Sequence, residues 1–315
     1  MTAGAEPQSA ATCPVLAGTT AIGKTDLVLS LARRFPIEII SLDSRQIYHG
    51  MRIGTAQPTE TEKAVCAHHL VDFVCPTDQY SAVAYRHDFA RVYQEIRSRN
   101  RLPVLVGGAG MYLAALQEGL FDLPDVTAAD TMRLREELTA LSEKEIRRQL
   151  LDLDAESWQR IHPHDRYRSQ RALEICLLAG RSMTELMREH APQPVLDLDF
   201  PLVLLQRSAE ECNIRIAART AAMFEQGWLE ETEDLLEQYG SDAPGLAAIG
   251  YREIVAHLRG ELAATDLAGK IITSTRQYAK RQRTWFRNVP REIAGAPEDP
   301  QVVQTLERLI TAALA

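Results

Sequence analysis

Residues 18–25, GTTAIGKT, contain two glycines separated by four residues and then Lys and Thr, a pattern typical of a phosphate-binding loop. In such a loop, backbone N–H groups and the positive end of the following helix surround the phosphates. Lys24 would add a point charge, and the hydroxyl of Thr25 is placed to hold Mg²⁺. The alternative is a glycine-rich turn without a ligand. We expect the whole segment to bind phosphate: Gly18, Thr19, Thr20, Ala21, Ile22, Gly23, Lys24 and Thr25.

Asp43 directly follows the apolar run IEIISL, so its carboxylate should lie at the carboxyl end of a strand, facing the phosphate site. A carboxylate there can accept a proton from an attacking amine or hydroxyl, or orient Mg²⁺ through water. Spacing alone does not separate these roles, and a helix N-cap is the structural alternative. Ser44, Arg45 and Gln46 follow on the same turn and can read a substrate edge with their donors and acceptors.

Two further groups of residues suit a phosphate-bearing ligand. In RLPVLVGGAGMYL, glycines 107, 108 and 110 occupy a strand-to-helix junction where backbone can approach a ligand, although such glycines are often structural. Arg215 and Arg219 lie four positions apart on one predicted helix face, with Arg207 just before that helix. One or more of these arginines could clamp a diphosphate, or the face could simply be solvated or ion-paired.

An alternation of strands and helices must position these groups. The segments CPVLAG, IEIISL and RLPVLVGG read as buried strands followed by amphipathic helices, which predicts a mostly parallel sheet covered on both faces. From residue 125 to 194 the pattern is helical throughout, and FPLVLLQ then supplies one more strand. We therefore predict an α/β fold: a P-loop-containing, mostly parallel sheet core of residues 13–124 and 195–315, a helical insertion domain at 125–194, and a flexible leader at 1–12.

Composition excludes several classes. The longest apolar runs are far shorter than the ~20 residues that span a bilayer, and no basic region followed by an apolar stretch opens the chain, so we expect a cytoplasmic protein without membrane contact. Five cysteines without a CxxC pair fit a reducing compartment. Cys66, His68, His69 and Cys75 depart from structural zinc spacing, and VDFV beside them reads as a buried strand.

The net charge of −8 argues against binding a polyanion through overall charge, so local basic clusters must decide. One cluster lies in RYRSQRALE and contains Arg166, Arg168 and Arg171. The other lies in TRQYAKRQRTWFRNVPR, where aromatic residues are interleaved with Lys and Arg. Either cluster taken alone could be a solvated helix face.

Several longer motifs carry a family resemblance. In order and spacing, GTTAIGKT, EIISLDSRQIYHGMRIGTAQP, HHLVDF, VLVGGAGMYLAAL, RALEI, IGYREI and TRQYAKRQRTWFR resemble the tRNA dimethylallyltransferase family from about Val15 to Phe286. The resemblance implies that the loop binds the diphosphate of dimethylallyl diphosphate and that Mg²⁺ assists its departure. Asp43 matches the family's catalytic acidic residue, which hydrogen-bonds or deprotonates the exocyclic amine of the adenine. Lys24 and Arg215, the latter as a diphosphate clamp, complete the implied catalytic set.

The same resemblance implies a partner, the anticodon stem-loop of tRNA. We expect the protein itself to be a monomer. The adenine beside the anticodon would be flipped into a channel through the core, in line with the general need to extrude a base before chemistry on it. The helical insertion would embrace the stem, and the C-terminal basic helix would meet the loop. The implied tRNA-binding set is Asp43, Ser44, Arg45, Gln46, Ala109, Arg133, Tyr167, Arg168, Ser169, Gln170, Arg171, Lys280, Arg281 and Arg283.

The sequence departs from the family pattern at three positions. The usual loop reads GPTASGKT, whereas here Thr19 replaces the proline and Ile22 replaces the serine. The family's GGTG reads GGAG, so that Ala109 lacks a threonine hydroxyl. Two other functions stay open at this point: a small-molecule or nucleotide kinase, which also uses a phosphate loop, and a non-catalytic tRNA-binding protein with a degenerate loop.

Overall fold

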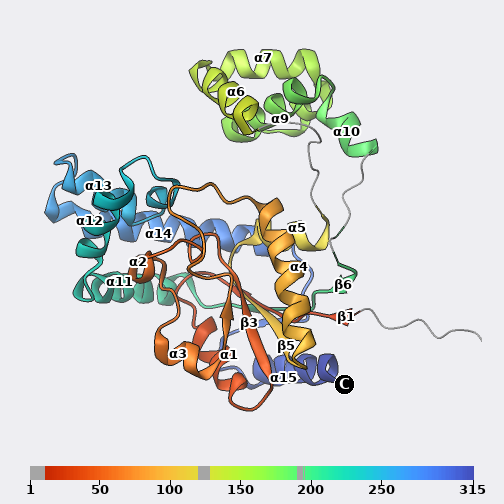
Figure 1. Ribbon diagram of the computed structural model, residues 1–315, viewed down its shortest axis with the longest axis vertical. Coiled ribbons are helices and arrows are strands. Elements are labelled where there is room, and N and C mark those ends of the chain that lie inside the picture. The colour runs from red at the N-terminus through yellow and green to blue at the C-terminus, as the bar shows by residue number, and fades with distance from the viewer. Residues whose placement is uncertain (1–10, 120–127, 190–193, 195) are drawn as a thin grey trace, which may run out of the picture. The chain divides into compact units, whose positions relative to one another are not determined.

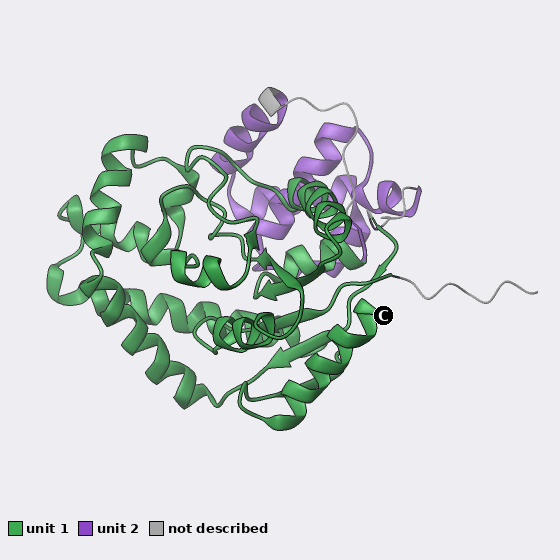
Figure 2. Cartoon of the chain, turned by 60° about the horizontal axis from the view of Figure 1, so that its bottom comes forward, with its two compact units in different colours: residues 1–117, 195–315 green, residues 118–194 purple. Residues whose placement is uncertain are grey.

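The computed structural model describes residues 11–119, 128–189, 194 and 196–315. The chain forms two compact units, one of residues 1–117 and 195–315 and one of residues 118–194 (Figure 2). The second unit thus begins before the predicted insertion boundary at residue 125, because the chain leaves the first unit where α5 (Gly110–Gln117) ends. Residues 1–10 of the predicted leader lie outside the described residues. Its last two residues are instead strand β1 (Ala11–Thr12).

The first unit is built on a six-stranded sheet in which every pair of neighbouring strands is parallel (Figure 1). This confirms the predicted α/β class and the mostly parallel sheet. A short parallel pair, β1 with β6 (Leu198–Asp199), leads into two neighbouring strands of this sheet, and the N–H of Cys13 donates to the carbonyl of Asp199 between them. The order across the main sheet is β4 (His68–His69), β3 (Ile37–Leu42), β5 (Leu102–Gly107), β2 (Val15–Gly18), β7 (Leu202–Leu205) and β8 (Ile293–Gly295).

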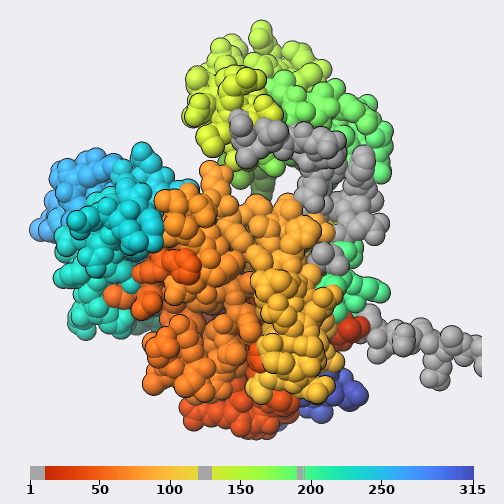
Figure 3. All heavy atoms as spheres, viewed as in Figure 1, coloured from red at the N-terminus to blue at the C-terminus, as the bar shows by residue number. Residues whose placement is uncertain are grey.

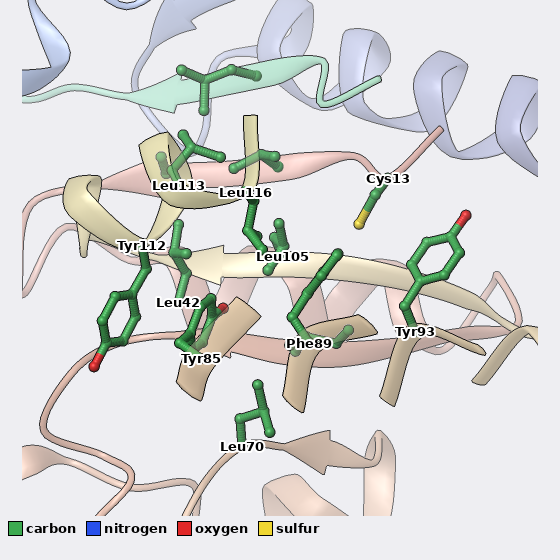
Figure 4. Close-up of a cluster of buried hydrophobic side chains, with 14 of the residues drawn as sticks. Cys13, Leu42, Leu70, Tyr85, Phe89, Tyr93, Leu105, Tyr112, Leu113 and Leu116 are labelled. Carbon is green, nitrogen blue, oxygen red and sulfur yellow. The ribbon is translucent and has the colours of Figure 1, made fainter. Parts of the chain in front are cut away.

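Helices cover both faces of the sheet, which is why its central strands are continuous apolar runs rather than alternating ones. On one face α4 (Ala82–Ser98) and α5 bury Tyr85, Phe89 and Leu113 against the strands (Figure 4). Helix α4 lies at the surface on this side in the space-filling view (Figure 3). On the other face the sheet packs against α1 (Lys24–Ala32) and α15 (Pro300–Leu314). Successive residues of one strand point to opposite faces, as Leu16 and Ala17 do.

Four helices and a short segment after β3 enclose a third apolar cluster, which includes Trp228, Tyr251 and Ile271. This cluster matters for function because it sits under α2 (Arg52–Thr55), the helix of the MRIGT motif. The four helices are α11 (Ala209–Glu225), α12 (Trp228–Tyr239), α13 (Tyr251–Leu258) and α14 (Ala264–Phe286). The short helix Pro244–Ala247 also contributes to this cluster, whereas α3 (Glu60–Val65) lies against α1.

The second unit is helical wherever the structure describes it, with its own core around Leu138, Leu150 and Leu173. Polar side chains cap the N-termini of its helices. Ser142 and Glu145 form a capping box, and Asp154 accepts the N–H of Ser157 at 2.9 Å. The helices are α6 (Ala128–Ala140), α7 (Glu143–Leu153), α8 (Ala155–Arg160), α9 (Arg166–Ala179) and α10 (Met183–Glu189).

One predicted strand is wrong. VDFV was expected to be a buried strand, but the edge strand is His68–His69 and the chain turns immediately after it. Leu70 and Asp72 have φ angles of 57° and 56°, in the left-handed region that breaks a strand. The five cysteines are free thiols, and no cluster of metal-ligating side chains occurs within the described segments. No helix in those segments is long and apolar enough to cross a membrane.

Glu38 forms a buried ionic cluster that predicts an acid-sensitive contribution to stability. Its carboxylate lies 2.7 Å from Arg99 NH2, 3.1 Å from Arg101 Nε and 2.6 Å from His69 Nε2. Burial raises the pKa of Glu38, but hydrogen bonds from Arg99 and His69 outweigh this and hold it below its ordinary value. A lowered carboxyl pKa stabilises the fold above the unfolded-state pKa and loses that effect as pH falls.

Replacing Glu38 with Gln should therefore lower the free energy of unfolding at pH 7 by ~1–2 kcal/mol, a modest figure because the two arginines are partly exposed. Urea titrations at several pH values would measure this, and the deficit should shrink below about pH 4. Glu95→Gln, at an exposed ion pair on α4, is the control and should change stability by less than ~0.5 kcal/mol. An equal deficit at pH 3 and pH 7 would contradict the ionic origin.

Candidate active site

The carboxyl ends of β2, β3 and β5 bring three turns together. Leu42 pairs with Gly107 in the sheet, and its carbonyl accepts the N–H groups of Gly108 and Ala109 at 3.0 and 2.9 Å. A Cβ atom on Gly107 would lie 2.1 Å from the oxygen of Leu42, so this position needs glycine for close packing. The loop after β2, the Asp43 turn after β3 and the glycine turn after β5 are therefore fixed side by side.

The Gly18–Thr25 loop runs from the end of β2 into the first turn of α1. Gly23 has a φ of 106°, a conformation open to glycine, and Ala21 also has a positive φ of 61°. Lys24 Nζ donates to the carbonyls of Gly18 and Thr19 at 3.1 and 2.8 Å. The Lys24 ammonium thus lies against the loop that was predicted to bind phosphate.

A cavity of about 830 Å³ opens on this loop, and Thr20 to Thr25 line it. Two side chains of the loop are buried. Thr19 is 3% exposed, with its hydroxyl 4.0 Å from Cys212 Sγ, and Ile22 is 2% exposed within the core. The side chains of Thr19 and Ile22 pack beneath the loop, so these two residues would serve a phosphate through their backbones, and their part in binding stays a prediction.

Asp43 lies where the large cavity meets a second cavity of about 250 Å³, and its side chain lines both. Oδ1 accepts the N–H groups of Arg45 and Gln46 at 2.8 and 3.3 Å. No helix begins at this turn, so Asp43 is not the helix N-cap that was the structural alternative, and the two N–H groups occupy only one carboxylate oxygen. Among the described residues Oδ2 accepts no hydrogen bond, so the turn can orient Asp43 while leaving an oxygen for proton transfer.

Cationic groups surround the loop. Burial lowers the pKa of Lys24 to about 8, while the nearby Asp43 opposes this and Arg219 adds to it. Arg219 donates to the Thr20 hydroxyl at 3.3 Å and lines both cavities, and burial lowers the pKa of its guanidinium. Arg215, the arginine chosen from the sequence, lines the large cavity and donates from Nε to the carbonyl of Ala21 at 2.6 Å. Arg207 instead pairs with Glu298.

The predicted tRNA-contacting residues of the first unit differ in their surroundings. Ser44 and Arg45 line the smaller cavity. Gln46 lines the large cavity, and its amide accepts from Ser41 Oγ at 2.9 Å and donates to the carbonyl of Ala56 at 2.7 Å. Ala109 is partly buried against the core. On α14, Lys280 and Arg281 are exposed and Arg283 is half-buried.

Two family models match this chain. One described as IPP transferase matches residues 46–289, and one described as isopentenyl transferase matches residues 12–69. The chain belongs to the IPP transferase family. This confirms the predicted family and the transferase class, and it argues against the kinase and the non-catalytic alternatives.

Individual members of the IPP transferase family are similar over most of the chain. The tRNA dimethylallyltransferase of Chromobacterium violaceum is 40% identical over 278 residues, covering 87% of this chain and 86% of that protein. The tRNA delta(2)-isopentenylpyrophosphate transferase of Staphylococcus epidermidis matches with a TM-score of 0.66 and 31% identity, covering 96% of this chain and 98% of that one. A eukaryotic dimethylallyltransferase, solved acting on tRNA, has a TM-score of 0.74 and 28% identity, covering 88% of this chain and 70% of that one.

The predicted tRNA-binding residues of the helical insertion differ in how far their side chains are exposed to solvent. Tyr167 and Arg168, in the first turn of α9, are 76% and 74% exposed. Arg133 on α6 is 78% exposed and lies 3.8 Å from Glu137. Gln170 is half-buried, and Arg171 is paired with the buried Glu174.

Ser169 is the exception within α9. It is fully buried, so the prediction that its side chain contacts tRNA is wrong. The reason is helical periodicity, because Ser169 shares the inward face with Ala172, Leu173 and Cys176.

Four residues of this IPP transferase were missed or passed over by sequence reasoning. Arg219 was considered but not chosen, and Tyr278 lines both cavities. Glu231 accepts the N–H groups of Arg52 and Ile53 at 3.0 and 2.9 Å and so caps α2. Tyr251 donates to Glu231 at 2.6 Å, which ties the IGYREI motif to the MRIGT motif. Some of these residues lie in motifs shared with the family, but the spacing of residues within a motif could not show which distant residues they contact.

The lowered pKa of Lys24 predicts a pH dependence of donor use. A lysine with a pKa of about 8 loses its charge as pH rises through 8, well before an ordinary lysine does. The value of kcat/KM for the diphosphate donor, which reports the free enzyme, should therefore fall above about pH 8. In the Lys24→Arg variant the arginine keeps its charge at all these pH values, so its kcat/KM should not fall above pH 8. A wild-type profile flat to pH 10 would contradict the assignment.

Proposed function

We propose that this protein transfers a dimethylallyl group from dimethylallyl diphosphate to the exocyclic N6 amine of the adenosine adjacent to the anticodon in tRNA, releasing diphosphate. The observation that carries the proposal is the position of Asp43 at the junction of the two cavities, opposite the Lys24 loop. Family membership supports the reaction type.

The large cavity suits the donor. Its phosphate end would lie against the Gly18–Thr25 loop, where loop N–H groups and Lys24 meet negative charge. Arg215 and Arg219 approach the same loop from α11 and would stabilise the diphosphate as it leaves.

The smaller cavity suits an adenine ring. Apolar side chains of Ile216, Met223 and Trp228 line it together with the polar Ser44 and Arg45. An adenine entering there would bring its N6 amine to Asp43. As nitrogen forms its bond to the allylic carbon, the carbon–oxygen bond to diphosphate breaks, and Asp43 accepts the proton that nitrogen loses.

The residues also fit a role for Mg²⁺. The hydroxyl of Thr25 and the carboxylate of Asp43 line the same cavity, and Mg²⁺ typically binds one or two such oxygens together with substrate phosphates. When bound, Mg²⁺ would neutralise charge on the departing diphosphate. Thr25 would hold the ion, and Lys24 and Arg219 would share the neutralisation.

The direct test is incubation of the purified protein with dimethylallyl diphosphate, Mg²⁺ and unmodified tRNA, followed by mass spectrometry of the tRNA nucleosides. We expect prenylated adenosine and released diphosphate, with no need for ATP. Absence of prenylation across several tRNAs and donors, together with ATP turnover on a small acceptor, would overturn the proposal.

The exposed residues of α9 supply a separate prediction about tRNA. Arg168→Ala should weaken tRNA binding and reduce the slope of log affinity against log salt by about 1, because one phosphate contact is lost. Filter binding at several salt concentrations measures both. Arg181→Ala is the matched control, because Arg181 lies beyond the other end of α9 and is ion-paired with Glu189 as Arg168 is with Asp165, and it should change neither quantity. Equal effects of the two variants would contradict a specific role for α9.

A further inference from the structure

The side-chain amide of Gln282 joins two of the three turns at the active site. Its Oε1 accepts the backbone N–H of Thr20 at 3.0 Å, and its Nε2 donates to the carbonyl of Gly108 at 3.0 Å. Gln282 projects from α14 and is 6% exposed. One side chain thus hydrogen-bonds both the Lys24 loop and the glycine turn, which lie far from it in sequence.

Gln282 is closely packed against the glycine turn. A Cβ atom on Gly108 would lie 2.3 Å from Gln282 Nε2 and 2.8 Å from the carbonyl oxygen of Gly18. Three residues along α14, the ring of Trp285 lies against Gly110, where a Cβ atom would come within 2.2 Å of Cδ2. A Cβ atom closer than 3.0 Å to another heavy atom would require one of the two groups to shift. Helix α14 therefore packs closely against the turn at two positions that need glycine.

Thr20 is also held from a second direction, because Arg219 donates to its hydroxyl at 3.3 Å. Loops of this kind bind phosphate through backbone N–H groups. An N–H that already donates to a buried amide is not offered to a ligand, so Gln282 decides which N–H groups of the loop point into the large cavity.

We propose that Gln282 is a positioning residue for prenyl transfer, which fixes Thr20 and Gly108 so that the loop keeps the shape that binds the donor diphosphate. This inference rests on the proposed function. Gln282 acts through the backbone of Thr20. Its loss should weaken donor binding while tRNA binding is preserved.

Gln282→Met tests the inference, because methionine keeps the length of the side chain and removes both hydrogen bonds. We expect KM for dimethylallyl diphosphate to rise roughly tenfold, as two neutral hydrogen bonds would give, with KM for tRNA within twofold of wild type. Calorimetric titration with inorganic diphosphate and Mg²⁺ should show a matching loss of affinity. Gln277→Met, at an exposed position on the same helix, is the matched control and should behave as wild type.

The results separate positioning from a merely structural role. A lower fraction of folded enzyme would reduce kcat and leave both KM values unchanged, which would overturn the inference, as would wild-type diphosphate affinity in a folded Gln282→Met protein. Gly108→Ala displaces the same amide from the other side and should reproduce the donor defect if Gln282→Met does not fold. Because inorganic diphosphate needs no acceptor, loss of its affinity in the variant would uphold the inference even if the wild type failed to prenylate tRNA.

Discussion

Asp43→Asn should lower turnover by ~10²–10⁴-fold while tRNA binding is preserved, because asparagine keeps the shape of the side chain but cannot accept the proton. The amide oxygen of asparagine can still accept the N–H groups of Arg45 and Gln46, so the turn after β3 should survive. Single-turnover rates with saturating donor and tRNA measure the chemical step, and filter binding measures tRNA affinity.

The control for this substitution is Asp234→Asn, at an exposed position on α12, which should leave the rate within twofold. Normal turnover of Asp43→Asn would reduce Asp43 to a turn-capping residue. A joint loss of rate and tRNA affinity would point to a collapsed turn.

Lys24→Ala should lower kcat/KM for the donor by roughly 10- to 150-fold, which corresponds to ~1.5–3 kcal/mol for a charge-assisted contact with diphosphate. The fold should persist, since among the described residues the ammonium hydrogen-bonds only to the loop carbonyls of Gly18 and Thr19. Titration of the donor at saturating tRNA measures the effect.

Lys63→Ala is a demanding control for Lys24 because Lys63 borders the same cavity. Its ammonium is 2.9 Å from Glu60 on α3, away from the loop. We expect donor kinetics within twofold of wild type in that variant. Equal losses in the two variants would mean that the cavity needs positive charge in general, without a particular place for Lys24.

Apolar runs and the residues that follow them were enough to predict the parallel sheet and to place the phosphate loop and Asp43 at one edge of it. The apolar runs before Gly18 and Asp43 end in parallel strands, and parallel strands place their carboxyl ends at one edge, so the loop and the carboxylate had to be neighbours. The glycine turn after β5 follows the same logic.

Side-chain direction within a motif was harder to predict. Ile22 and Thr19 belong to the loop pattern, but a pattern of residue types does not say which side chains pack below the loop. Ser169 could have been excluded, because its spacing to Leu173 and Cys176 places it on the apolar face of α9.

Contacts between distant segments lay beyond local reasoning. Nothing near Gly54 in the sequence indicates that a Cβ atom there would lie 2.0 Å from Trp228 Nε1. The part that Arg219 plays beside Arg215 was not evident for a related reason, since its burial beside Asp43 depends on how α11 packs on the loop. Both features follow from tertiary packing.

The contact between Gly110 and Trp285 has a consequence for natural variation. Each position constrains the other, because a side chain at 110 would need the volume that the indole ring fills. Substitution at one site should therefore be tolerated only after a compensating reduction at the other, and among distant relatives the two positions should change together. A relative with alanine at the position of Gly110 should carry a smaller ring, or none, at the position of Trp285.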